Sequence, residues 1–361
     1  MQREAAFAHG ATCGMPGCPR QRGSEKATPR TTGLIAVCKV ANHFQKLHRC
    51  LVKNFQLISL VLNWYVIVAF MFAYLIGVDG GGTGTRVRVA DPAGTVLCQG
   101  EAGPSALGQG VEAAWVQILR AIASAFHALG KPCPDWSVCA LGAGLSGVNH
   151  LPWRDQFLAL NPGFARIALE SDAHTALLAA HGGKPGAMVA AGTGSIGEAL
   201  YADGTRRQVG GWGFPVGDEG SGAWLGLRAM AHAQAALDGR IAPGVLAQRI
   251  HRQCGTHRDD LQRWCAQAAQ HEYASLARTV FECADTDPVA LALVERAAQA
   301  IEQMAQALDP CGNLALAICG SVGRELQPRL SATVRSRCVS SDCDAAHGAL
   351  TLIQRTLETT S

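Results

Sequence analysis

The chain has 361 residues, of which 48% are apolar and 16% charged, so it can bury large cores in two domains and is not intrinsically disordered. Its net charge of +3 is uneven: residues 1–70 carry nine Lys/Arg against two Glu, and the rest carries 22 basic against 26 acidic residues. A mildly acidic main body argues against nucleic acid as a partner.

The fourteen cysteines are irregularly spaced, and the sequence contains no CxxC pair. Without paired short spacings, a structural zinc site is not expected. Several cysteines, such as Cys139 and Cys319, lie in apolar runs. We therefore expect reduced, buried thiols and a cytoplasmic protein.

The first 70 residues differ from the rest of the chain. Residues 57–78 form a run of 22 mostly apolar residues, and about 20 are enough to span a membrane. Lys46, Arg49 and Lys53 would suit a cytoplasmic N-terminus. The end of this run is also needed as the first strand of the next domain. We therefore expect the native chain to start near Met71, with a membrane anchor or signal segment as the alternative.

From residue 73 onward the pattern is that of an α/β domain. Short apolar strands flank the glycine loop DGGGTGT (79–85), and a later apolar-periodic stretch predicts a helix. In chain order, strands are expected at 74–78, 87–89, 96–97, 138–141 and 167–169, and the helix at 110–129. Ser171 and Asp172 follow the last of these strands, where such residues favour a helix N-cap.

The second half repeats the order strand, glycine loop, strand, turn and strand. Its loop is GTGS (192–195), and its hairpin turn is ADGT. Strands are expected at 187–191, 198–201 and 314–319, with helices between 223 and 308, the last of them capped by Thr286 or Asp287, and at 347–356. We therefore predict two duplicated α/β domains, 71–185 and 186–361, around a central cleft that both glycine loops face.

Glycine loops at strand ends bring backbone N–H groups close to phosphate. The first loop adds the hydroxyls of Thr83 and Thr85, and Asp79 at the strand end could hold Mg²⁺, usually through water. An ordinary turn is the alternative for either loop. Two loops in matching contexts favour a shared polyphosphate site.

Two other nucleotide motifs are excluded. GTGSIG (192–197) and GAGLSG (142–147) match G-x-G-x-x-G, but a dinucleotide site needs that loop to open a helix. The first runs into a predicted strand, and Pro152 follows the second. Both Gly-Lys pairs are followed by Pro, so no P-loop is present.

The segments VDGGGTGT, ESDAHTALLAA, AAGTGSIG and GGWGFPVGDEGSGAWLG (210–226) resemble the N-acetylglucosamine kinase and BadF/BadG/BcrA/BcrD ATPase group, most closely its bacterial glucosamine kinases. The resemblance covers about residues 74–358 and leaves 1–70 unmatched. It implies ribonuclease-H-like (actin-like ATPase) domains, ATP and Mg²⁺ as cofactors, a small amino sugar as substrate and phosphorylation at its 6-hydroxyl. A homodimer is the expected assembly.

The resemblance also implies roles for individual residues. Asp172 matches the catalytic aspartate, which would accept the proton of the sugar hydroxyl. The expected nucleotide and metal contacts are Asp79, Gly81, Gly82, Thr83, Thr85, Gly192, Thr193, Gly194, Ser195, Gly320 and Ser321, with Asp79 nearest the metal. The expected sugar contacts are Ser105, Gly211, Trp212, Asp218 and Glu219.

One departure concerns the sugar site. Many relatives carry G-P-S-N-L near the sugar, whereas this chain has GPSAL with Ala106 in place of Asn, so one amide contact is missing and the preferred amino sugar stays open. ROK sugar kinases are disfavoured because their zinc-binding cysteine cluster is absent. Two other functions stay open: an ATPase that energises a redox partner and carries an iron–sulfur cluster, and a sugar sensor without turnover.

Overall fold

The computed structural model describes residues 72–341 and 344–360. All of these residues belong to one compact unit. The expectations for residues 1–70 and Met71 therefore lie outside the described residues. The end of the apolar run at 57–78 is described, and it forms strand β1 (Tyr74–Gly80). None of the described helices is long and apolar enough to cross a membrane.

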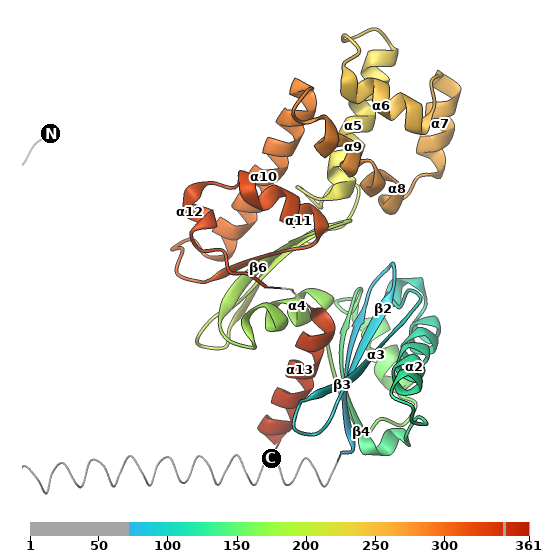
Figure 1. Ribbon diagram of the computed structural model, residues 1–361, viewed down its shortest axis with the longest axis vertical. Helices are drawn as coiled ribbons and strands as arrows, with labels where there is room; N and C mark the ends of the chain where they lie inside the picture. The colour runs from blue at the N-terminus through green and yellow to red at the C-terminus, as the bar shows by residue number, and fades with distance from the viewer. Residues whose placement is uncertain (1–71, 342–343, 361) are drawn as a thin grey trace, which may run out of the picture. The chain divides into compact units, whose positions relative to one another are not determined.

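The first half contains a five-stranded sheet in the order β3-β2-β1-β4-β5. Figure 1 shows this sheet between α2 (Val111–Ala128) and α13 (Ala345–Thr360). Its other strands are β2 (Thr85–Ala90), β3 (Val96–Ala102), β4 (Cys139–Leu145) and β5 (Arg166–Glu170). β1 to β3 are antiparallel neighbours, whereas β4 runs parallel to both β1 and β5. The loops that follow β1, β4 and β5 therefore meet at one edge of the sheet.

The second half contains a four-stranded sheet in the order β8-β7-β6-β9. Its strands are β6 (Gly186–Ala191), β7 (Ser195–Leu200), β8 (Arg206–Gly210) and β9 (Leu316–Cys319). β6 and β9 are parallel, so the loops at 192–194 and after 319 also meet at one edge. The GTGS loop joins β6 to its antiparallel partner β7, which agrees with the rejection of a dinucleotide site.

Helices cover both sheets and fill the predicted helical region. Those before β6 are α2 (Val111–Ala128), α3 (Leu151–Ala159) and α4 (Asp172–His181). Those after β8 are α5 (Gly222–Leu237), α6 (Val245–Cys254), α7 (Arg258–Gln267), α8 (Gln270–Ser275), α9 (Ala277–Cys283), α10 (Pro288–Leu308), α11 (Ser321–Leu326), α12 (Ala332–Arg335) and α13 (Ala345–Thr360). Asp287 caps α10 by accepting from Val289 and Ala290 N–H groups.

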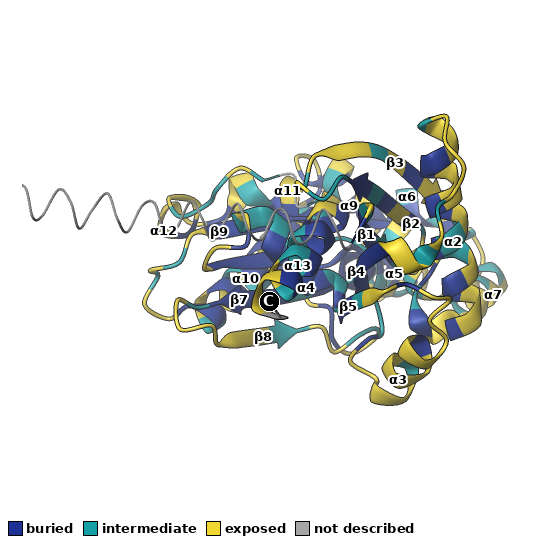
Figure 2. Ribbon diagram, turned by 90° about the horizontal axis from the view of Figure 1, so that it is seen from below, coloured by how far each residue is buried: buried dark blue, intermediate teal, exposed yellow. Residues whose placement is uncertain are grey.

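Opposite faces of the first sheet are covered by α2 and α13. The apolar stripe of α2 packs with residues such as Ile76 and Val78, because one face of an amphipathic helix fits a sheet. Leu350 and Ile353 of α13 pack with Leu75 on the other face. Strands β1 and β4, which lie between these two helices, are mostly buried (Figure 2). The expected domain 186–361 is therefore wrong at its end: α13 belongs to the first sheet.

Two local expectations also need correction. Residues 142–145 of the predicted GAGLSG loop belong to β4. α3 then begins with Pro152 in its first turn, where the backbone N–H that proline lacks would have no partner within the helix. Cys139 is a buried free thiol as expected, but Cys319 is disulfide-bonded, so the prediction of reduced thiols fails at that residue.

Candidate active site

The loops at the parallel strand ends of both sheets line one cavity of about 770 Å³. The loops after β1, β4 and β5 contribute from the first sheet, and the loop after β6 contributes from the second. From the two glycine loops, Gly82 and Thr83 lie in the wall together with Thr193, Gly194 and Ser195. The two loops therefore face a shared space, as the sequence predicts.

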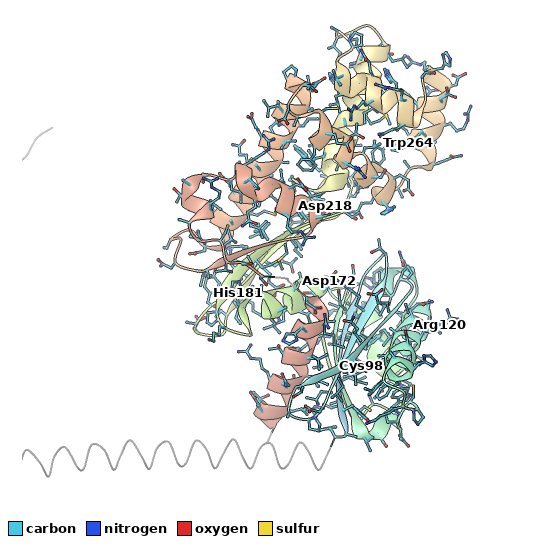
Figure 3. The ribbon with its side chains drawn as sticks, viewed as in Figure 1. Cys98, Arg120, Asp172, His181, Asp218 and Trp264 are labelled. Atoms are coloured by element: carbon cyan, nitrogen blue, oxygen red, sulfur yellow. The ribbon has the colours of Figure 1, made fainter. Side chains whose placement is uncertain are left out.

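Asp172 lies in this wall at the first position of α4 (Figure 3). Ser171, not Asp172, is the helix cap: its hydroxyl accepts the His174 N–H at 3.0 Å. Burial raises the pKa of Asp172 to about 6, and the Ala173 N–H, 2.9 Å from Oδ1, opposes that rise while Asp79 and Glu198 add to it. The carboxylate is therefore ionised at neutral pH, yet it accepts a proton more readily than an ordinary aspartate.

Asp218 is the second carboxylate of the cavity wall, and Figure 3 shows it in the segment before α5. Its backbone has a φ of 61°, and its side chain is buried. Oδ1 accepts the Ser195 N–H at 3.3 Å, and Oδ2 accepts from Gln270 Nε2 at 2.7 Å. Burial raises the pKa of this carboxyl. The second glycine loop and α8 thus hold Asp218 in place.

Of the remaining sugar contacts expected from the sequence, one lines the cavity and two do not. Gly211 lines the cavity, but Trp212 and Glu219 do not. Trp212 is 87% exposed, and the Glu219 carbonyl accepts the Ser195 hydroxyl at 2.8 Å while its side chain lies at the surface.

Thr85 and Ser105 support the first loop from behind and do not reach the cavity. Both are 1% exposed. The Thr85 hydroxyl lies 2.6 Å from the Gly103 carbonyl and 2.7 Å from the Ser105 hydroxyl, and the Gly81 carbonyl accepts the Ser105 N–H at 3.1 Å. The expectation that these hydroxyls face phosphate and sugar is therefore wrong in this structure, because neighbouring backbone and side-chain groups already satisfy them.

Asp79 is the next-to-last residue of β1 but is not in the cavity wall. Its Oδ2 accepts from Arg86 Nη2 at 2.6 Å and from Nε at 3.1 Å. Burial raises the pKa of Asp79, and Arg86 opposes the rise. No group of three His, Cys, Asp or Glu among the described residues could hold a metal alone. One carboxylate nevertheless fits Mg²⁺, which usually binds one or two carboxylates plus water and substrate phosphates.

Gly320 and Ser321 follow β9, the parallel neighbour of β6. A Cβ at Gly320 would lie 2.2 Å from the Ala191 carbonyl and 3.1 Å from the Gly192 nitrogen. Ser321 lines a separate cavity of about 640 Å³ between α9 and α11. Gly320 therefore packs against the end of β6 and the first residue of the second glycine loop.

Sequence reasoning missed several polar residues of the main cavity wall. These are Gln109, Asn149, His150, Gln208, Gln270 and His271. Asn149 and His150 follow β4, so the strand-end rule could have found them. Gln270 begins a short helix and carries no local signal. The wall contains no Lys or Arg among the described residues.

Comparisons with known proteins identify relatives of this chain. Residues 76–322 match the BadF/BadG/BcrA/BcrD ATPase family. A glucosamine kinase of Vibrio cholerae is 32% identical over 278 residues, covering 77% of this chain and 94% of that protein. An N-acetylmuramic acid/N-acetylglucosamine kinase of Clostridium acetobutylicum is 29% identical over 175 residues, covering 48% and 57%.

A solved structure from Chromobacterium violaceum, of a provisionally named N-acetylglucosamine kinase, is 46% identical with a TM-score of 0.76. The match covers 78% of this chain and 99% of that one. The expected fold, two α/β domains of the actin-like ATPase type, is therefore confirmed.

Proposed function

Because the chain belongs to the BadF/BadG/BcrA/BcrD ATPase family and is an ATP-dependent sugar kinase, we propose that it transfers the γ-phosphate of ATP to the 6-hydroxyl of an amino sugar, glucosamine or N-acetylglucosamine. One observation carries this proposal: a single cavity is lined by Thr83, by Thr193 of the second glycine loop, and by the carboxylate residues Asp172 and Asp218.

Asp172 would act as the general base. The sugar hydroxyl gives its proton to the carboxylate while its oxygen bonds to the γ-phosphorus, and the bond to the β,γ-bridging oxygen breaks to release ADP. Phosphoryl transfer requires mainly positioning and charge stabilisation from the protein. The backbone N–H groups of the two loops would orient the phosphates. Mg²⁺, when bound beside Asp79 and the phosphates, would supply positive charge.

Asp218 would accept hydrogen bonds from sugar hydroxyls. Its buried position between Ser195 and Gln270 fixes the carboxylate, and a fixed acceptor can orient a polyol. Gly211 would let the sugar approach the backbone. Ser321 and the cavity beside it would take the adenosine, with the phosphates passing Gly192 toward Asp172.

A coupled ADP-release assay with glucosamine, N-acetylglucosamine, glucose and N-acetylmannosamine tests this function. We expect release that depends on an amino sugar and a product with phosphorus coupling at C6 in its NMR spectrum. ATP hydrolysis independent of every sugar would instead support the ATPase alternative, and sugar binding without ADP release would support the sensor. Light scattering would test the expected homodimer.

A further inference from the structure

Glu198 on β7 is a buried carboxylate that the proposed reaction does not use. Its side chain is 3% exposed. Oε1 accepts three hydrogen bonds, from His174 Nδ1 at 2.7 Å, Arg206 Nη2 at 2.8 Å and Arg206 Nε at 3.1 Å. Oε2 is buried without a hydrogen-bond partner. Burying a charge is costly unless it is paired, so a carboxylate in this place calls for an explanation.

The pairing continues to the first sheet. Arg206 Nη1 lies 3.1 Å from Glu170 Oε1. Glu170 ends β5 and His174 lies in the first turn of α4, two residues before and two residues after Asp172. Glu198 and Arg206 lie on β7 and β8 of the second sheet. These four side chains, hereafter the clamp, therefore hold the chain on both sides of Asp172 against the second sheet.

None of the four clamp residues lines the cavity, so they act on the reacting atoms indirectly, and Asp172 lies in the middle of the segment that they hold. The charged groups that act on the Asp172 carboxyl are Asp79 from β1 and Glu198 from β7, and both raise its pKa beyond the effect of burial. Glu198 itself has a lowered pKa despite its burial, because His174 and Arg206 bond to it. It therefore keeps its negative charge beside the base.

We propose that Glu198, held by His174 and Arg206, is a positioning residue that fixes the start of α4 to the second sheet and so places the Asp172 carboxylate for proton transfer. This inference rests on the proposed function. A misplacement of about 1 Å far from the chemistry can cost about 10²-fold in rate. Loss of the clamp should therefore lower kcat and leave substrate binding intact.

Two matched pairs of variants test the clamp. In His174→Asn the side-chain amide N–H takes the position of the histidine Nδ1 and can still donate to Glu198. In His174→Gln the amide N–H takes the more distant position of Nε2 and does not. Arg206→Gln removes two bonds to Glu198, whereas Arg207→Gln changes the next side chain, which points to the other face of the strand. We expect kcat to fall about 10-fold to 100-fold in His174→Gln and Arg206→Gln, with KM changed less than about threefold. His174→Asn and Arg207→Gln should stay close to wild type.

Hydrogen exchange gives a readout that does not need turnover. The Thr175 N–H donates to the Ser171 carbonyl at 3.1 Å in the first turn of α4. Its exchange should be faster in His174→Gln than in His174→Asn. Equal kcat in all four variants, or equal losses in His174→Asn and His174→Gln, would overturn the proposal. Absence of sugar-dependent ADP release from the wild type would refute the proposed function instead, and the exchange comparison would still decide whether the clamp holds α4.

Discussion

At the scale of single residues, Asp172 carries the strongest expectations. Because its pKa is raised to about 6 in the protein without substrate and the base must be ionised, we expect kcat/KM to be level above pH 7 and to fall about tenfold per pH unit well below 6. Replacing Glu198 by Gln removes a negative charge that raises this pKa, so the acidic limb should move to lower pH. A kcat/KM profile measured from pH 5 to 8.5 checks both expectations. An acidic limb at the same pH in Glu198→Gln and wild type would contradict the effect of the Glu198 charge on the pKa of Asp172.

The raised pKa of Asp172 also predicts a change in stability. The folded protein binds this proton more tightly than the unfolded chain. The buried charge therefore lowers the free energy of unfolding above pH 6, and this loss of stability disappears as the pH falls from 6 toward 4. The rise from 3.8 to about 6 corresponds to roughly 3 kcal/mol. At pH 7.5 Asp172→Asn should raise the free energy of unfolding by up to about 3 kcal/mol, because the neutral amide avoids the cost of burying the charge.

The same variant should lower kcat by about 10²-fold or more. Urea unfolding and the ADP assay on one preparation measure both effects. A variant that is less stable at pH 7.5 but stabilised at pH 4 would reverse the expected sign, and wild-type turnover would remove Asp172 from the mechanism.

At the scale of elements, Gly192 of the second glycine loop and Gly320 after β9 are glycines for different reasons. Gly320 has a φ of 84°, and a Cβ there would meet the Ala191 carbonyl at 2.2 Å, whereas a Cβ at Gly192 would meet nothing within 4 Å. Gly320→Ala should destabilise the fold by about 1–3 kcal/mol. Gly192→Ala should leave Tm nearly unchanged and weaken ATP binding about tenfold, because its methyl group occupies space that phosphate needs. Thermal unfolding and calorimetry with ATP distinguish the two, and unchanged affinity in Gly192→Ala would place the phosphates elsewhere.

Local elements could be predicted where the pattern was local. Periodicity of the apolar residues predicts the strands beside both glycine loops and the amphipathic helix α2. α3 buries only Phe157, so its sequence shows no apolar periodicity that would predict a helix. The apolar face of α13 is visible in the sequence, yet the sheet that it covers is not. From the sequence, Thr85 and Ser105 are expected to bind phosphate and sugar because their hydroxyls lie near glycines. The sequence does not show whether such a hydroxyl faces a ligand or a neighbouring strand.

At the scale of the whole described region, the predicted reaction requires that the cavity exclude water. Trp212 lies between the cavity-lining Gly211 and Gly213 but is 87% exposed. If sugar binding closes this segment, Trp212 emission should shift to the blue, and Trp212→Phe should abolish the shift. Trp264→Phe serves as the control, because Trp264 packs against Tyr273 outside the cavity wall. Calorimetric sugar binding without any emission change would contradict closure over Trp212.

The return of α13 to the first sheet has a consequence for biosynthesis. β1 and β4 would have an uncovered apolar face until Leu350, Ile353 and Leu357 have left the ribosome. The half of the protein that is translated earlier therefore finishes folding last, and a ribosome that stalls before α13 would release a chain with the Asp172 region formed on an open sheet.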